Sequence, residues 1–202
     1  MEYDHHIFLS YAHGIIWSPW IKDIFVPRLQ GYLELEVGPV VISVDYQIEP
    51  GALWDPNLHR RVARSRIMLA LLSANYFHRE WCRREMALMF QREKSLGLEG
   101  RDENYGLLIP VRLGDGLTFP DLIRRVQHMD FEEFTNPDLP PGSPSAAGFN
   151  QRLKQLAQVI RRTLPRVPGD CSDQWNEFTG EEYMSRLCAK PLPAPVPSRL
   201  LV

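Results

Sequence analysis

The chain has 202 residues, of which 44% are hydrophobic and 24% are charged, a balance typical of one globular domain with a proper core. Its formal net charge of -2, without a run of like charges, argues against a protein drawn by charge to nucleic acid or an acidic membrane. No apolar run approaches the ~20 residues of a membrane helix, and the acidic start leads into a strand instead of a signal peptide. Three separated cysteines, Cys82, Cys171 and Cys188, fit neither a disulfide framework nor a zinc motif. We therefore expect a soluble, cytoplasmic protein that binds no nucleic acid and no membrane.

Apolar runs alternate with segments of helical periodicity over the first 165 residues. The runs predict strands at residues 6–12, 39–45, 66–73, 105–113 and, as a short edge strand, within 127–134. The periodic segments predict helices at about 19–35, 57–65, 80–95, 121–126 and 149–164. Pro27 predicts a kink or a later start in the first helix, and residues 136–148 are expected to form a loop. This alternation predicts an α/β fold: a flavodoxin-like, five-stranded parallel sheet with helices on both faces and residues 66–73 as its central strand.

The alternation ends at Pro165, so we divide the chain into a domain at residues 1–165 and a C-terminal extension at residues 166–202. The extension has no strand signal and is rich in proline near its end. It is either a partly ordered tail or a segment that docks on the domain or on a partner. The second alternative depends on Trp175, Phe178 and Tyr183, since aromatic side chains are costly to leave in water.

One carboxylate, Glu85, stands among apolar residues in the helix expected at 80–95. None of the residues three and four positions away is basic, namely Trp81, Cys82, Leu88 and Met89. By contrast, Glu80 can form an ion pair with Arg84. Ligands of a flavodoxin-like sheet bind beyond the carboxyl ends of the first and third strands, where the strand order reverses. The helix with Glu85 begins beside that crevice, and its amino end favours an ionised acid. The sequence therefore places an unpaired acid near the expected ligand site.

Three motifs carry a resemblance to a known family: HIFLSYAH from residue 6, SVDYQIEPGALW from residue 43, and SRIMLALLSANYFHREWCRREM from residue 65. In order and spacing they resemble the signatures of Toll/interleukin-1 receptor (TIR) domains, including a Trp-Cys-x-x-Glu segment. The resemblance covers roughly residues 4–165 and is to the bacterial, NAD+-cleaving type. One departure is Arg79, because family members often carry Ser two residues before the Trp.

The resemblance implies an enzyme, because many bacterial and plant TIR domains cleave the nicotinamide–ribose bond of NAD+. Their essential Glu corresponds to Glu85, and the aromatic residue that lines the pocket one turn earlier corresponds to Trp81. One carboxylate suffices chemically, because nicotinamide leaves as a neutral molecule and the acid has only to stabilise an oxocarbenium-like transition state. Trp81 can stack on the cationic pyridinium ring. The sequence does not decide whether the product is ADP-ribose, a cyclic isomer or a base-exchange product.

Further substrate contacts are assigned to the motifs and to two loops, at Phe8, Ser10, Tyr11, Ala12, Trp54, Cys82 and Phe119. Ser10 can cap a helix or touch the ligand. Trp54 is a packing anchor or part of a loop that TIR domains use for self-association and for gating the pocket. Phe119 lies in GDGLTFP, which resembles a loop that in some TIR assemblies supplies an aromatic to a neighbour's pocket. Cys82 is more typical of a buried small hydrophobe than of a nucleophile.

We thus expect an assembly-activated NAD+ glycohydrolase or cyclase in a bacterial defence or cell-death pathway, with NAD+ as substrate and no cofactor. No metal site is expected, because the adjacent His5 and His6 point to opposite faces of a strand. Expected partners are further copies of the chain, through TIR–TIR contacts, and an upstream sensor protein. The alternative is a non-catalytic adaptor that acts through self-association alone and has no need of Glu85. A receiver-like phosphoacceptor is disfavoured, because it would need paired acids after the first strand and an Asp after the third.

Overall fold

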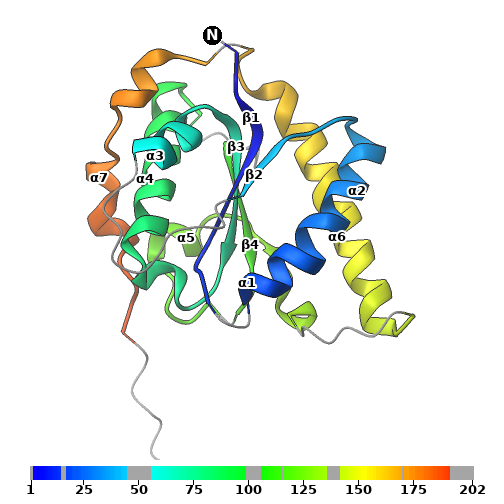
Figure 1. Cartoon of the computed structure of the whole chain (residues 1–202). Helices are drawn as coiled ribbons and strands as arrows, with labels where there is room; N and C mark the ends of the chain where they lie inside the picture. The colour runs from blue at the N-terminus through cyan, green and yellow to red at the C-terminus, as the bar shows by residue number, and fades with distance from the viewer. Residues whose placement is uncertain are drawn as a thin grey trace, which may run out of the picture.

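The computed structural model describes residues 2–14, 17–44, 56–98, 106–114, 116–135, 142–169 and 171–191. Within these residues a parallel sheet is covered by helices on both faces (Figure 1). One face carries α1 (Trp17–Trp20), α2 (Val26–Glu36) and α6 (Pro144–Thr163). The other carries α3 (Pro56–Ala63) and α4 (Glu80–Ser95), with the short helices α5 (Asp121–Arg124) and α7 (Glu181–Met184) on the same side. No helix in the described ranges is long and apolar enough to cross a membrane.

The strands pair in the order β2-β1-β3-β4-β5, and every pair is parallel. Their bounds are β1 His5–Tyr11, β2 Ile42–Val44, β3 Ser65–Leu72, β4 Leu108–Arg112 and β5 Met129–Asp130. The flavodoxin-like fold expected from the sequence is confirmed, with β3 at its centre. The register pairs Ser10 with Ala70 and Tyr11 with Leu71, so the carboxyl ends of β1 and β3 lie side by side. This is the edge where strand order reverses and where such sheets bind ligands.

β2 and β4 are shorter than their apolar runs predicted, since they hold three and five residues. The short edge strand expected within 127–134 is β5, which holds two residues. β5 ends at Asp130, whose Oδ1 accepts a hydrogen bond from Glu132 N over 3.0 Å and turns the chain into the 3₁₀ turn η3 (Glu132–Phe134). Phe131 and Phe134 then each pack 6.1 Å from the ring of Phe149 in α6. Aromatic packing against α6 therefore replaces further strand pairing.

The start of α6 corrects the prediction, because the helix begins at Pro144 inside the segment expected to be a loop. Ser143 is its N-cap, and Oγ of this residue accepts a hydrogen bond from Ala146 N over 3.1 Å. Pro144 follows at the first helical position, where its fixed φ is favourable and its missing N–H does no harm. The Ser-Pro pair is the signal that an analysis of apolar periodicity alone overlooks.

The first helical region is continuous from α1 to α2, but the two helices are joined by a π turn, η1 (Ile21–Phe25). In this turn the N–H of Val26 donates to the carbonyl of Ile21, five residues back. The turn comes just before Pro27, which has no N–H to continue an α-helical pattern. The irregularity predicted at Pro27 thus takes the form of a π turn.

Residues 171–191, here called the C-terminal segment, run along the outer side of α4 (Figure 1). The segment follows the 3₁₀ turn η4 (Leu164–Arg166) and contains η5 (Asp173–Glu177), α7 and η6 (Ser185–Leu187). Gly180 N donates to Gln91 Oε1 over 2.7 Å. Tyr183 is buried and stacks on Phe90, with ring centroids 5.5 Å apart. The described part of the extension therefore docks on the domain, whereas the boundary at residue 165 stays a prediction.

A buried cation lies where the C-terminal segment meets α4. Arg92 is almost fully buried, and its Nη1 donates to the carbonyls of Val62 and Ser65 over 3.1 and 2.8 Å. Its guanidinium lies 4.3 Å from the ring centroid of Trp175, a cation–π contact removed from water. Trp175 is itself buried, so it closes the outer side of this contact.

Gly180 brings the backbone of the C-terminal segment close to α4. Its φ is +68°, and a Cβ there would lie 2.7 Å from Ala87 Cβ and 2.8 Å from the backbone carbon of Ala87. We expect Gly180→Ala to lower the free energy of unfolding by about 1–3 kcal/mol, the range for a side chain forced into the left-handed region, as measured in urea. Gly97→Ala is the matched control, because Gly97 has a similar φ of +63° but its Cβ would meet nothing within 4 Å. Equal unfolding midpoints for the two variants would contradict this close packing.

Candidate active site

Glu85 lies in the second turn of α4, the helix that follows β3 at the carboxyl edge of the sheet. The helix begins at Glu80, as predicted, and the expected ion pair joins Glu80 Oε1 to Arg84 Nη2 over 2.7 Å. Between β3 and α4 the chain forms the 3₁₀ turn η2 (Tyr76–His78). A hydrogen bond from Tyr76 N to Ser73 O, 3.0 Å long, fixes the start of this turn. The edge therefore gathers side chains from β1, η2 and α4.

Two short hydrogen bonds connect three buried side chains at this edge. Ser10 Oγ donates to Glu85 Oε2 over 2.5 Å, and the same Oγ lies 2.6 Å from the hydroxyl of Tyr76. The exposed fractions of Ser10, Tyr76 and Glu85 are 1%, 0% and 6%. The interpretation of Glu85 as an unpaired acid is therefore wrong. Its partner comes from β1, which a comparison of neighbours along the helix cannot reveal.

Tyr76 is a residue of this edge that the sequence analysis did not assign. Its pKa is raised well above the usual value, chiefly because burial disfavours the charged form and further because Cys82 and Glu85 are near. The hydrogen bond with Ser10 acts in the opposite direction and does not outweigh burial. The hydroxyl thus keeps its proton near neutral pH. A tyrosine four residues after the central strand was the available signal, because a buried hydroxyl usually finds a polar partner.

The residues of the first motif, HIFLSYAH, lie partly in the core and partly at the carboxyl edge of the sheet. Phe8 is fully buried and pairs in register with Met68, so it lies in the core and presents no surface to a ligand. Tyr11 and Ala12 lie at the end of β1 and are both largely buried. The ring of Tyr11 stacks on His13, with centroids 4.7 Å apart. The structure therefore brings Ser10 and Tyr11 to the edge and places Phe8 in the core.

Trp81 and Cys82 lie in the first turn of α4, one turn before Glu85. Trp81 is half-buried and packs against the core, whereas Cys82 is buried and reduced. Trp54 lies outside the described residues. Over the ranges that the structure describes, no group of three His, Cys, Asp or Glu side chains is arranged to hold a metal ion.

Phe119 lies in its own chain's interior, and its assignment to a neighbour's pocket stays a prediction. Its side chain is 3% exposed and packs edge-on against Phe77, with centroids 5.2 Å apart. Phe77 in turn packs 5.2 Å from Tyr76. The loop is held from outside by the C-terminal segment, because Lys190 N donates to Thr118 O over 2.9 Å. The loop sequence alone cannot show this, since the hydrogen bond comes from a distant segment.

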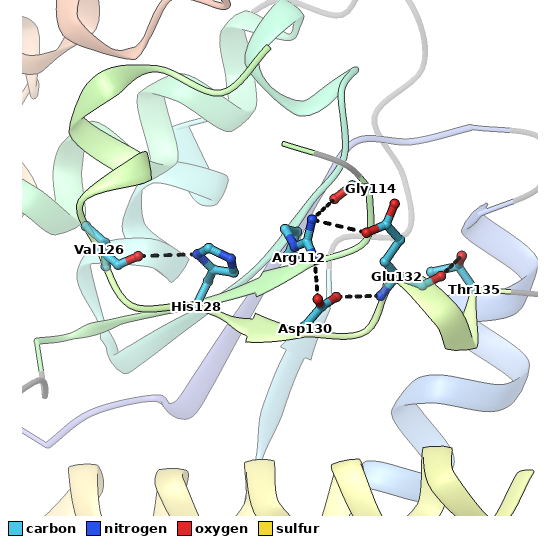
Figure 2. Close-up of polar contacts among 7 residues, drawn as sticks. All are labelled: Arg112, Gly114, Val126, His128, Asp130, Glu132 and Thr135. Atoms are coloured by element: carbon cyan, nitrogen blue, oxygen red, sulfur yellow. Dashed lines mark hydrogen bonds and ion pairs between the residues drawn. The ribbon is translucent and has the colours of Figure 1, made fainter. Parts of the chain in front are cut away.

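A charged cluster fixes the carboxyl ends of β4 and β5 (Figure 2). Arg112 Nη1 donates to Gly114 O over 3.2 Å and lies 3.1 Å from Glu132 Oε2, while Arg112 Nη2 pairs with Asp130. Burial raises the pKa of Asp130, but the hydrogen bonds from Glu132 N and Arg112 outweigh it, so that this pKa is lowered. The cluster keeps β4, β5 and the following loop together and is structural in character.

Arg79 is the N-cap residue of α4, where the family resemblance led us to expect Ser. Its side chain makes no capping hydrogen bond and is exposed, while its carbonyl accepts from Arg83 N over 3.2 Å. A short side-chain oxygen at this position normally accepts from one of the first N–H groups of the helix. The departure from the family pattern therefore removes a helix cap.

We expect Arg79→Ser to restore this cap and to raise the free energy of unfolding by about 0.5–2 kcal/mol. Arg79→Ala is the matched control, because it removes the same charge and the same long side chain without supplying an oxygen. Urea unfolding of the three proteins measures the difference. Equal stability of the Ser and Ala variants would contradict the capping role of position 79.

Comparisons with known proteins identify the family of the chain. A family model described as TIR domain matches residues 7–140 of the chain, a range that includes Ser10, Tyr76 and Glu85. A search of curated proteins finds no match. Among solved structures, the chain is similar to the TIR domain of the Toll-related receptor TRR-2 from Hydra magnipapillata, with 16% identity and a TM-score of 0.40. The match covers 63% of this chain and 84% of that one. It is also similar to the TIR domains of the activated Roq1 resistosome that recognises the pathogen effector XopQ, with 16% identity and a TM-score of 0.38 over 91% and 97% of the two chains.

Proposed function

The chain belongs to the TIR domain family, and on this premise we propose that it cleaves the nicotinamide–ribose bond of NAD+ with Glu85 as the catalytic residue. The observation that carries the proposal is the carboxylate of Glu85, buried at the carboxyl edge of the sheet and hydrogen-bonded by Ser10. The position of this acid in the Trp-Cys-x-x-Glu motif supports the same role. A carboxylate shielded from water interacts strongly with a positive charge brought to it.

The reaction breaks the bond between C1′ of the ribose and the pyridinium nitrogen. The electron pair of this bond goes to the nitrogen, so nicotinamide leaves as a neutral molecule and no acid has to protonate it. Positive charge develops on the ribose, and Glu85 stabilises it electrostatically. Ordinary glycosidases need a second carboxylate because their leaving oxygen requires a proton. Water that adds to C1′ and releases a proton gives ADP-ribose; a nucleophile on the same molecule gives a cyclic product, and a second base gives an exchanged dinucleotide.

The proposal extends to assembly. Copies of the chain associate through TIR–TIR contacts, an upstream sensor protein triggers this association, and the output serves a bacterial defence or cell-death pathway. Support comes from the family resemblance. If the loop of Phe119 reaches a neighbouring chain in the assembled state, its ring must first leave Phe77. Light scattering at rising protein concentration tests self-association separately from catalysis.

Glu85→Gln keeps the size of the side chain and removes its charge. We expect this variant to release nicotinamide from NAD+ at least about 100-fold more slowly than the wild type, since a preorganised electrostatic contact to the transition state is typically worth that much. Nicotinamide is measured by chromatography at high protein concentration. Glu93→Gln is the matched control, because Glu93 is a buried acid of the same helix whose Oε1 accepts from Leu108 N over 3.0 Å, and an amide oxygen can accept that bond too.

Equal release by wild type and Glu85→Gln would contradict the catalytic role. No release by the wild type under any condition of concentration or assembly would favour the alternative, a non-catalytic adaptor that acts by self-association.

Trp81 gives a second test, because the proposal has its ring stack on the pyridinium cation. We expect Trp81→Ala to raise KM for NAD+ about 5- to 30-fold, as a shielded cation–π contact of ~1–2 kcal/mol predicts. Trp81→Phe retains an aromatic face and should show a smaller rise. Steady-state kinetics measure both variants. A loss of the same size in the Phe and Ala variants would contradict stacking.

A further inference from the structure

The hydrogen bond from Ser10 to Glu85 continues from Ser10 to Tyr76, and this arrangement points to a role for Tyr76 at the same edge. The inference rests on the proposed function. We infer that Tyr76 is a positioning residue, which orients the Ser10 hydroxyl and through it the carboxylate of Glu85. The hydroxyl of Tyr76 reaches Glu85 through Ser10, whose Oγ lies 2.6 Å from the tyrosine hydroxyl and 2.5 Å from Glu85 Oε2. The three side chains come from η2, β1 and α4.

The direction of the two hydrogen bonds follows from counting protons. A serine hydroxyl has one proton, and Ser10 donates it to Glu85. The proton between Ser10 and Tyr76 must then belong to Tyr76, which donates to Ser10 Oγ. Both donors therefore point toward the carboxylate as long as the acid is ionised. This polarised arrangement strengthens the bond to Glu85, because each hydrogen bond in such a chain polarises the next.

Tyr76 is held firmly enough to act in this way. Its side chain has no exposed surface, and its ring packs edge-on against Phe77, with centroids 5.2 Å apart. Phe77 is supported by Phe119 at the same distance. The backbone of Tyr76 is fixed by its hydrogen bond to Ser73 O. A serine hydroxyl turns freely about its Cβ–Oγ bond, so a fixed donor from Tyr76 is what selects the rotamer directed at Glu85.

A positioning role predicts an effect on the chemical step more than on binding. If Ser10 and Tyr76 orient Glu85 toward charge that appears only in the transition state, their loss lowers kcat and leaves KM nearly unchanged. If Ser10 instead contacts the substrate directly, as one interpretation of the sequence has it, its loss raises KM. The two roles of Ser10 therefore separate in steady-state kinetics.

The test is a double-mutant cycle with Ser10→Ala, Tyr76→Phe and the combined variant, each assayed for nicotinamide release. Tyr76→Phe removes only the hydroxyl and leaves the ring packing intact. We expect each single variant to lower kcat roughly 5- to 30-fold with KM within about twofold, and the combined variant to lose little more than Ser10→Ala alone, since Tyr76 acts through Ser10. Urea unfolding midpoints check that all variants fold.

Matched controls come from outside the site. Ser65→Ala removes a buried serine hydroxyl at the amino end of β3, where it donates to Arg61 O over 2.7 Å. Tyr183→Phe removes a buried tyrosine hydroxyl on the outer side of α4. Neither should change kcat by more than about twofold.

The possible outcomes distinguish a failure of the positioning role of Tyr76 from a failure of the proposed NAD+ cleavage. Release that depends on Glu85, together with multiplicative losses in the double variant, would overturn the inference and leave the function standing. So would a Tyr76→Phe variant with unchanged kcat, or a rise in KM as the main effect. Absence of release from the wild type would overturn the proposed function, and the inference with it.

Discussion

Ser10 donates a hydrogen bond to Glu85 and so connects β1 with α4, two elements far apart in the sequence. An ionised carboxylate buried without donors is unfavourable by on the order of several kcal/mol, so the sheet and the helix must meet correctly for Ser10 to supply its donor to Glu85. The register of β1 on β3 is therefore a requirement of the site as well as of the sheet. A slip of one residue would bring Leu9 or Tyr11 to the position of Ser10, with the side chains of β1 on the opposite face.

The helix that carries Glu85 is held at both edges of the sheet by buried charges. Glu85 meets Ser10 at the carboxyl edge, whereas Arg92 donates to the carbonyl of Ser65 at the amino end of β3. Burial lowers the pKa of Arg92, and the nearby Tyr3 and Cys171 act against this shift. Each charged group has its partner on another element, so α4 can neither slide nor rotate without breaking one of these contacts. A helix held in this way is a rigid support for a catalytic acid.

Local patterns in the sequence predicted the parts of the fold that depend on local chemistry. Apolar periodicity indicated α4, the four-residue spacing of opposite charges indicated the ion pair of Glu80 with Arg84, and an apolar run indicated the central strand. The same patterns did not show the Ser143 cap of α6, because a cap is a single side-chain hydrogen bond without periodicity. They could not give the partner of Glu85 or the burial of Phe119 either. Both depend on contacts between residues brought together only by the folded sheet and the C-terminal segment.

The position of the C-terminal segment has a consequence for the order in which the protein is completed. Synthesis delivers every strand of the sheet by Asp130, while the residues that cover the outer side of α4 leave the ribosome afterwards. Domains generally fold as units, with amino-terminal parts formed first. The helix of Glu85 therefore lacks the ring contact of Phe90 with Tyr183 until Tyr183 has been synthesised. A helix from the middle of the sequence is thus among the last elements to reach its final surroundings.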